Sequence, residues 1–289
     1  MNEQQKRLME KCFNGRYILK KNIGQGGMGS VYKVLCTEDK NIYAAKIIEN
    51  KEQGNSDEEA RILLKLNHPM LPGIKEYFTY DTFTVIVMDY IEGSNLENYV
   101  KNNGPMSQKT ALIVIRQIMD VLMYLHSQEP PVIYRDLKPA NIMSDKKMRL
   151  HLIDFGTARR YKTENSNDTI ALGTPGYAAP EQLMGCGQSD TRTDIYSLGA
   201  TIYYLVTGID IGKPPFEAMP INTVRGGISS GFADIIEKCL QKNPKKRYQS
   251  ISEIVRELDM VEYGSKSLEK NTTKTINIVI THSNKNITF

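Results

Sequence analysis

The chain has 289 residues, enough for two ordinary domains or one large two-lobed domain. Hydrophobic residues make up 40% and charged residues 24%, which is typical of a soluble globular protein with a substantial core. The formal net charge of +4 is far from the strongly basic balance of nucleic-acid-binding proteins, so we expect no nucleic-acid partner.

The four cysteines are scattered and form no CxxC pair, which argues against a disulfide framework or a zinc site. The first residues lack the apolar core of a signal peptide, and no apolar run approaches the ~20 residues of a membrane span. We therefore expect a cytoplasmic chain with reduced thiols and no membrane segment.

Up to about residue 90, apolar and polar residues mostly alternate, which predicts strands. The predicted strands are Tyr17–Ile23, Val31–Leu35, Ile42–Ile48, Ile74–Tyr80 and Phe83–Met88. One helix interrupts them: it is expected to begin near Ser56 and to end before His68-Pro69. Its apolar face comprises Ile62, Leu63 and Leu66.

From about residue 94 the apolar period becomes helical. Ser107 begins a long helix, and Thr193–Thr207 is a strongly apolar helix that Gly208 closes. Ser250 and Glu253 form a capping box that opens the last helix, which runs to about residue 263.

A strand-rich half followed by a helix-rich half predicts an α+β protein of two lobes. We place the lobes at residues 17–90 and 91–263, after an extension over residues 1–16. Residues 264–289 form a polar tail with one alternating run, Thr275–Thr281, which is either a loosely docked strand or part of a linker.

A glycine-rich segment, Gly24-Gln25-Gly26-Gly27-Met28-Gly29, lies between two predicted strands. Glycines allow backbone N–H groups to approach phosphate oxygens closely. A dinucleotide-binding fold would need a helix directly afterwards, but Val31 opens a strand, so a hairpin over a nucleotide is favoured over that fold. A plain flexible turn stays open as an alternative, and Lys46 in the next strand either faces an anion or extends to water.

Three motifs follow in order: Tyr134-Arg135-Asp136-Leu137-Lys138-Pro139-Ala140-Asn141, Asp154-Phe155-Gly156 and Ala179-Pro180-Glu181. They resemble the catalytic loop, the metal-binding loop and the APE motif of eukaryotic-type (Hanks-type) serine/threonine protein kinases. The resemblance covers roughly residues 17–260, and Gln182 after the APE motif is similar to bacterial members. It implies a small, mostly antiparallel sheet lobe with one key helix and a larger, mainly helical lobe.

The resemblance implies transfer of the ATP γ-phosphate to serine and threonine hydroxyls of protein substrates, with magnesium, or alternatively manganese, as cofactor. Asp136 would accept the proton of the hydroxyl, and Lys138 would lie beside the γ-phosphate. Asn141 and Asp154 would hold the metal ions, because hard cations prefer oxygen ligands.

The resemblance also implies that Lys46 contacts the α- and β-phosphates and is held by Glu59. Glu59 has an alternative role, because it stands three residues after Ser56 and fits a capping box. The implied nucleotide site comprises Gly24, Gln25, Gly26, Gly27, Gly29, Val31, Ala44, Lys46, Met88, Asp89, Ile91 and Met143.

Within that site, Val31, Ala44 and Met143 would sandwich the adenine, and Met88 would lie at the back. The backbone of Asp89 and Ile91 would bond the edge of the ring. Outside the family resemblance, the methionines would simply be core residues.

The chain departs from the family pattern at two places. Tyr134 stands where histidine is usual, and its ring is expected to pack against Phe155. The stretch Lys213–Ser230 is short and broken by prolines and glycines where most members have a helix that docks substrates, so docking by that surface is in doubt.

Three contacts are further implied by the resemblance. Glu181 should pair with Arg247, and the alternative is a pair of solvated charges. Asp194 should anchor the backbone around Tyr134 and Arg135, unless it is only a favourable charge at a helix start. Thr174 should contact Asp136 and Lys138, which is typical of the serine/threonine branch.

The segment between Asp154 and Glu181 is a candidate for regulation. We expect autophosphorylation at Ser166 or Thr169, and less so at Thr163, with Arg135 and Arg159 receiving the phosphate. A homodimer would serve this reaction. The alternative is that Glu164 or Asp168 already supplies the negative charge.

Two other functions are alternatives to a protein kinase. A pseudokinase used as a scaffold would be favoured by loss of Lys46, Asp136 or Asp154, and all three are present. A small-molecule kinase of related fold would lack the segment Gly173–Glu181, which in protein kinases shapes a groove for an extended peptide.

Overall fold

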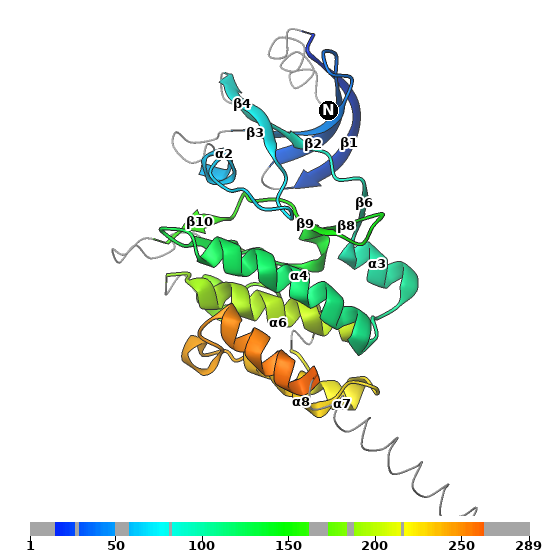
Figure 1. The fold of residues 1–289 in the computed structure, drawn as a ribbon, viewed down its shortest axis with the longest axis vertical. Helices are drawn as coiled ribbons and strands as arrows, with labels where there is room; N and C mark the ends of the chain where they lie inside the picture. Colours follow the sequence, from blue (N-terminus) through cyan, green and yellow to red (C-terminus); the bar gives the residue numbers. More distant parts are fainter. Residues whose placement is uncertain are drawn as a thin grey trace, which may run out of the picture.

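An antiparallel sheet of five strands forms the upper lobe of the protein, and helices form the lower lobe (Figure 1). The computed structural model describes residues 15–26, 29–49, 58–80, 83–161, 173–183, 188–214 and 217–262. The sheet has the order β1-β2-β3-β5-β4. Its strands are β1 (Tyr17–Gly26), β2 (Gly29–Cys36), β3 (Ile42–Glu49), β4 (Ile74–Tyr80) and β5 (Phe83–Asp89).

Alternating side chains of these strands enter two separate apolar clusters, one on each face of the sheet. Tyr32 and Val34 of β2 are buried in the outer cluster. Ala44 and Met88 belong to the inner cluster. In the register, Lys46 lies opposite Val31 on one side and Ile86 on the other, so the lysine sits in the middle of the sheet.

The helix of the upper lobe, α2 (Glu58–Leu63), packs beside the sheet through buried Ala60. Ile62 and Leu63 are buried as predicted, but Leu66 lies beyond the end of the helix. The prediction that Leu66 continues the helical face is therefore wrong. Leu66 still packs against the core from the turn, which explains its apolar character.

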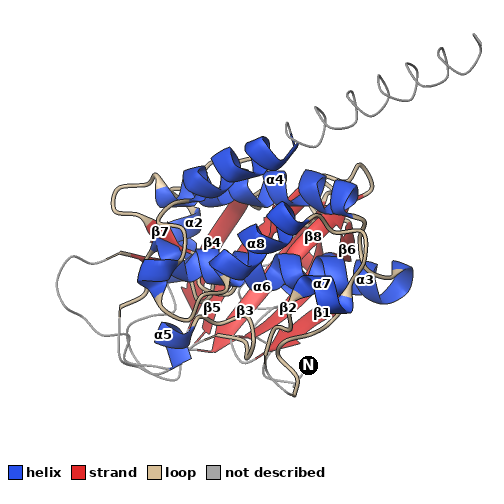
Figure 2. Ribbon diagram, turned by 90° about the horizontal axis from the view of Figure 1, so that it is seen from below, coloured by secondary structure: helices blue, strands red, loops and turns tan. Residues whose placement is uncertain are grey.

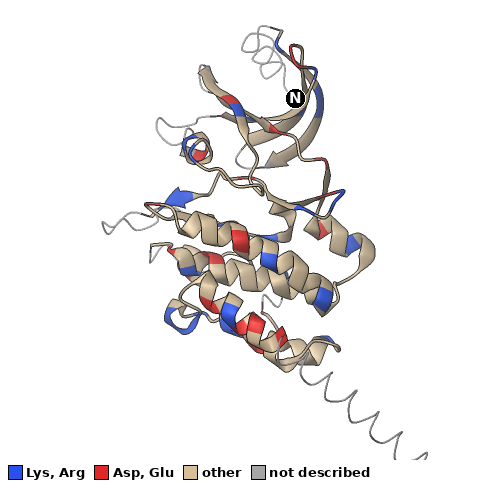
Figure 3. Cartoon of the chain, viewed as in Figure 1, with Lys and Arg blue, Asp and Glu red and all other residues tan. Residues whose placement is uncertain are grey.

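The lower lobe is built on long helices that lie side by side, with α6 between α4 and α8 (Figures 1 and 2). Its helices are α3 (Leu96–Asn103), α4 (Gln108–His126), α5 (Pro180–Leu183), α6 (Thr191–Thr207), α7 (Ile221–Val224), α8 (Ser230–Cys239) and residues 251–262, with 3₁₀ turns η1 (Pro139–Asn141) and η2 (Pro244–Lys246). Helix α6 carries charged residues only in its first turn (Figure 3), because the rest is buried in the core.

Several helices begin or end at residues that the sequence marks as helix caps. The hydroxyl of Ser107 accepts a hydrogen bond from the Thr110 N–H, and Gly208 closes α6 with a φ of 74°. The predicted capping box at Ser250 is only half right: its hydroxyl accepts from Glu253 N at 3.4 Å, but the Glu253 carboxylate accepts from Gln249 N at 2.9 Å instead of from Ser250 N.

Five short strands form two small sheets next to the boundary between the lobes. Strands β6 (Gly93–Asn95), β8 (Ile142–Asp145) and β9 (Leu150–Leu152) form one small sheet, and β7 (Val132–Ile133) pairs with β10 (Arg159–Arg160). Residues 134–141, which resemble the catalytic loop of protein kinases, run from β7 into η1 and β8. This loop is therefore anchored at both ends by hydrogen-bonded structure.

The α+β, two-lobed fold is confirmed. Between residues 213 and 230, α7 is a single helical turn, so the sequence breaks there shorten the helix without removing it. The predicted strand or linker over residues 275–281 lies outside the described residues. No helix in the part of the chain that the structure describes has the length and apolar character to cross a membrane.

Candidate functional site

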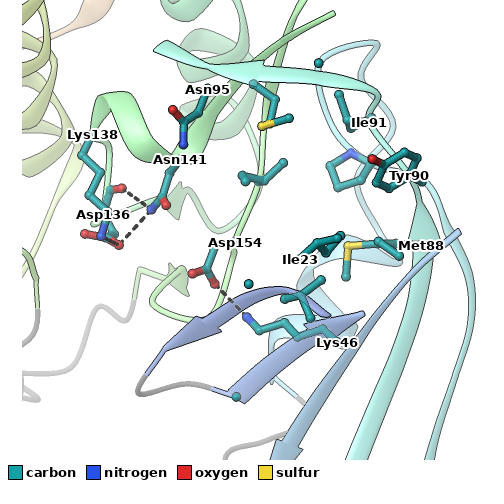
Figure 4. A pocket seen from close by; sticks show the side chains of 18 of the residues that line it. Ile23, Lys46, Met88, Tyr90, Ile91, Asn95, Asp136, Lys138, Asn141 and Asp154 are labelled. Carbon is teal, nitrogen blue, oxygen red and sulfur yellow. Dashed lines mark hydrogen bonds and ion pairs between the residues drawn. The ribbon is translucent and has the colours of Figure 1, made fainter. Parts of the chain in front are cut away.

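A cavity of about 830 Å³ lies between the two lobes (Figure 4), within the range of about 300–1,000 Å³ of small-molecule sites. Ten of the twelve residues predicted to bind nucleotide line it: Gly24, Gln25, Gly29, Val31, Ala44, Lys46, Met88, Asp89, Ile91 and Met143. Gly26 ends β1, and Gly27 lies outside the described residues.

The apolar end of the cavity is formed from both lobes. Ala44 and Met88 are neighbours in the β3–β5 register, and Met143 comes from β8 below them. Ile23 and Tyr90 also line the cavity and were not predicted. Their places in the sequence could have identified them, because Ile23 directly precedes the glycine segment and Tyr90 lies between Asp89 and Ile91, which were both predicted.

Strand β5 ends at Asp89, which lines this cavity. The N–H of Asp89 donates to the carbonyl of Gly73 at 3.0 Å, and the Asp89 carboxylate accepts from the Gly73 N–H at 2.9 Å. Because the N–H of Asp89 is already bonded, its carbonyl oxygen is the backbone atom that can contact a ligand.

Gly29 allows β2 to lie close against β3 at the start of the strand. Its φ is +124°, and a Cβ atom there would lie 2.2 Å from the carbonyl oxygen of Ile47. Any larger residue would force β2 away from β3, so this glycine is required by the close approach of the two strands.

Lys46 lies between two carboxylates at the polar end of the cavity. Its Nζ is 2.6 Å from an oxygen of Glu59 and 2.7 Å from Oδ1 of Asp154. The expected contact with Glu59 is therefore present, whereas Ser56 of the alternative capping box lies outside the described residues. Glu59 also accepts from the Phe155 N–H at 3.2 Å, which links α2 to the Asp154-Phe155-Gly156 motif.

Electrostatics favours the charged forms of Lys46 and Asp154, whereas burial raises the pKa of the Glu59 carboxyl in spite of the opposing charge of Lys46. Burial opposes the charge of Lys46, but the carboxylates of Glu59 and Asp154 raise the pKa of its ammonium group overall. Burial likewise opposes ionisation of Asp154, but the charge and hydrogen bond of Lys46 lower the pKa of that carboxyl. The site thus presents one cation and an ionised Asp154 to the cavity.

The carboxylate of Asp136 is held by three neighbours. Oδ1 accepts from the Thr174 hydroxyl at 2.9 Å, and Oδ2 accepts from Lys138 Nζ at 2.8 Å and from the Asn141 amide at 2.9 Å. Lys138 also donates to the Thr174 hydroxyl at 2.6 Å, so the predicted contacts of Thr174 are confirmed.

The residues expected to hold a metal ion have suitable oxygen atoms. The Asn141 amide nitrogen donates to the backbone and side chain of Asp136, which leaves the amide oxygen as its ligand atom. The Asp154 side chain is 40% exposed, and among the described residues no donor contacts its Oδ2. The Asn141 amide oxygen and the Asp154 carboxylate oxygen belong to residues that line the same cavity. Oxygen atoms of this kind are the hard ligands that magnesium prefers.

The catalytic loop is anchored from below by α6, as predicted. Asp194 is fully buried, and its carboxylate accepts from the N–H groups of Tyr134 at 2.9 Å and Arg135 at 2.8 Å. His126 Nε2 lies 2.8 Å from the same carboxylate. Arg135 has a φ of 71° and Asp154 a φ of 68°, a strained region for such residues that persists only where the surroundings hold it.

The ring of Tyr134 packs edge-on against Phe155, with centroids 5.0 Å apart, as predicted. Its hydroxyl donates to the carbonyl of Ile153, a bond that the sequence did not suggest. The Thr157 hydroxyl donates to the Tyr134 carbonyl at 3.2 Å. Tyrosine at this position therefore connects the loop 134–141 to the segment 153–157.

The predicted pair of Glu181 and Arg247 is confirmed as a buried contact. The two guanidinium nitrogens lie 2.7 and 2.8 Å from the two carboxylate oxygens, and the Arg247 side chain has no exposed surface. The same guanidinium donates to the carbonyls of Gln241, Arg192 and Lys242. The alternative of two solvated charges is excluded.

A second cavity, of about 250 Å³, adjoins the first and shares Lys138 and Thr174 with it. Two loops are in tight contact beside it, since a Cβ atom on Gly176 would lie 2.3 Å from the backbone nitrogen of Gly212, which lines the cavity. The sequence did not predict this cavity. It predicted only that the segment 173–181, which contributes to the lining, resembles one that shapes a peptide groove.

The expected phosphorylation sites cannot be placed, because Thr163, Ser166 and Thr169 lie outside the described residues. Of the two arginines expected to receive a phosphate, Arg135 is buried in the catalytic loop. Arg159 lies in β10, opposite Ile133 of β7.

Comparison with known proteins gives a single family. Residues 17–258 match the protein kinase domain. A probable serine/threonine-protein kinase of Clostridium perfringens is 29% identical over 273 residues, covering 88% of this chain and 39% of that protein. Serine/threonine-protein kinase B of Synechocystis is 31% identical over 288 residues, covering 86% and 47%.

Serine/threonine-protein kinase PknB of Mycobacterium tuberculosis is 30% identical over 277 residues, covering 86% of this chain and 43% of that protein. The chain thus spans less than half the length of these relatives. The resemblance to bacterial serine/threonine kinases is confirmed. With a family match over most of its length, the chain belongs to the protein kinase family.

Proposed function

We propose that the chain is an active serine/threonine protein kinase that transfers the γ-phosphate of ATP to hydroxyl groups of proteins. The observation that carries the proposal is the joint contact of Asp136, Lys138 and Thr174 beside a nucleotide-sized cavity. Phosphoryl transfer depends mainly on positioning and on neutralising charge, and these residues supply both.

Each residue has a defined task in this proposal. Asp136 orients the acceptor hydroxyl and accepts its proton, and Lys138 stabilises negative charge on the transferred group. Lys46 binds the α- and β-phosphates, and Glu59 holds it in place. Bound magnesium, or manganese, would supply charge neutralisation on the phosphates, with Asn141 and Asp154 as its protein ligands.

For the nucleotide, we propose that Val31, Ala44 and Met143 contact the faces of the adenine and that Met88 closes the back. The Asp89 carbonyl and the backbone of Ile91 would bond its edge. The Asp89 carbonyl would accept from adenine and the Ile91 N–H would donate to it, which suits the mixed donor and acceptor edge of the ring.

The second cavity supports a protein acceptor rather than a small molecule. It begins at Thr174 beside Asp136, and its volume of about 250 Å³ is below the range of about 300–1,000 Å³ of small-molecule sites. Such a hollow suits one side chain of a longer peptide. A pseudokinase is disfavoured because Lys46, Asp136 and Asp154 are all present and in contact with their partners.

The direct test uses the purified chain with radiolabelled ATP, magnesium and a mixed acceptor protein. We expect label in phosphoserine and phosphothreonine, and no label in phosphotyrosine or in small hydroxyl compounds. Label confined to small compounds would favour the small-molecule kinase instead.

The buried, unbridged thiols of Cys36 and Cys239 favour a reducing compartment, and we propose the cytoplasm.

We further propose regulation by autophosphorylation between two copies of the chain, at Ser166 or Thr169 and less so at Thr163. A phosphate carries nearly twice the charge of a carboxylate and more acceptor oxygens, so it pairs more strongly with Arg135 and Arg159. Mass spectrometry after incubation with ATP and magnesium should find a phosphate there, at a rate that rises with chain concentration. Full activity with an unmodified segment would instead assign the charge to Glu164 or Asp168.

A further inference from the structure

Gln182, the residue after the Ala179-Pro180-Glu181 motif, has no task in the proposed mechanism, yet only 1% of it is exposed. Its side-chain amide bridges two backbone groups. Oε1 accepts from the Ala179 N–H at 3.0 Å, and Nε2 donates to the Arg135 carbonyl at 2.9 Å, 47 residues earlier. A side chain of the segment 173–183 therefore contacts the backbone of the catalytic loop directly.

The carbonyl that Gln182 contacts belongs to the peptide bond between Arg135 and Asp136. Arg135 has the left-handed φ of 71°, which is strained for a residue other than glycine and relaxes unless its surroundings hold it. Asp194 holds the N–H of this residue at 2.8 Å, and Gln182 holds its carbonyl. Two buried side chains thus fix both backbone polar groups of the residue before Asp136.

The same segment also holds the other end of Asp136. The hydroxyl of Thr174 donates to Oδ1 of the carboxylate at 2.9 Å. The segment 173–183 therefore acts on Asp136 at two points, through Thr174 on its carboxylate and through Gln182 on the peptide plane that carries it. Both contacts come from the part of the chain that borders the second cavity, where the acceptor is proposed to bind.

We propose that Gln182 is a positioning residue for phosphate transfer. It holds the peptide plane between Arg135 and Asp136 so that the Asp136 carboxylate faces the acceptor hydroxyl. Because Gln182 belongs to the segment 173–183, the orientation of the Asp136 carboxylate also depends on the position of that segment. The inference rests on the proposed function.

The proposal predicts a specific kinetic effect. Without the Nε2 donor, the strained peptide loses the restraint on its carbonyl. The Asp136 carboxylate is then oriented less firmly toward the hydroxyl, although Thr174, Lys138 and Asn141 still contact it. The nucleotide contacts Ala44, Lys46 and Met88 lie in the other lobe and keep their places. Turnover therefore falls while ATP binding is retained.

Two variants test it. Gln182→Met has a similar length and removes both hydrogen bonds, whereas Gln182→Glu keeps the acceptor for Ala179 and lacks the donor for Arg135. We expect each to lower kcat about tenfold, equivalent to about 1.4 kcal/mol, with an unchanged KM for ATP. Active chain is counted by stoichiometric nucleotide binding, so partial unfolding does not imitate the effect.

Gln117 provides a matched control, because its amide bridges two backbone groups in the same way. Oε1 accepts from the Leu150 N–H at 3.1 Å, and Nε2 donates to the Met148 carbonyl at 3.2 Å, both outside the catalytic loop. Gln117→Met should lower the melting temperature and leave kcat unchanged.

The outcomes separate the two proposals. Turnover of the Gln182 variants equal to that of Gln117→Met would make Gln182 merely structural and overturn the inference. If Gln182→Met does not fold, Gln182→Glu decides in the same assay. A wild-type chain that binds ATP and transfers no phosphate would instead overturn the proposed function, and the inference with it.

Discussion

Replacing Asp154 by alanine is expected to lower phosphate transfer by about 10²–10³-fold or more, and Lys46→Met by a similar factor. Asp154 offers the carboxylate oxygen proposed to hold magnesium, and Lys46 is the cation proposed to bind the phosphates. The two side chains are 2.7 Å apart, so loss of Lys46 leaves Asp154 without this cation, whereas loss of Asp154 leaves Lys46 paired with Glu59 alone. The measurement is kcat/KM for ATP with a generic acceptor protein.

Because both residues serve one assembled site, the double variant should lose little more than either single variant. Asp120→Ala is the control, since the Asp120 side chain is 68% exposed and contacts only His68 among the described residues. It should retain wild-type turnover. Unchanged transfer in Asp154→Ala or Lys46→Met would remove the basis of the mechanism.

Replacing Arg247 by alanine is expected to destabilise the fold by about 3–5 kcal/mol. The substitution leaves the Glu181 carboxylate partly buried and without its bidentate partner, and three backbone carbonyls lose their donor. For a chain of this size, the melting temperature should fall by about 10 °C. Thermal unfolding followed by circular dichroism measures it.

Arg149→Ala is the matched control for this experiment. The Arg149 side chain is 68% exposed and contacts Asp145 in a surface pair, which is worth about 0–1 kcal/mol. Its melting curve should stay close to that of the wild type. An Arg247→Ala curve that coincides with the Arg149→Ala curve would show that the buried pair contributes nothing to stability.

Much of the site was predictable because its residues lie in short motifs of fixed spacing. The resemblance joined Lys46 to Glu59 and Glu181 to Arg247, although 66 residues separate the second pair. Alternation of apolar residues located the five strands of the upper lobe, since each strand buries side chains in a cluster on its face of the sheet. These signals are carried by the residues themselves.

Other contacts depend on where the backbone passes in three dimensions. Gln182 donates a hydrogen bond to the Arg135 carbonyl. The sequence pattern does not indicate which backbone carbonyl lies near a side-chain amide 47 residues away, so this bond was not predictable. Leu66 looked helical because a turn that packs on the core needs the same apolar residue as a helix face. Glu253 caps Gln249 instead of Ser250 because a flexible carboxylate reaches either neighbouring N–H group.

Asp136 is proposed to assist phosphate transfer to a protein hydroxyl, and one assay tests this role most directly. Wild type and Asp136→Asn are incubated with radiolabelled ATP, magnesium and a generic acceptor protein. Asparagine keeps the size of the side chain and removes the proton acceptor, so we expect label in the acceptor with wild type and a loss of about 10²–10⁴-fold with the variant. Equal labelling by the two chains, or no labelling by the wild type, would contradict the account.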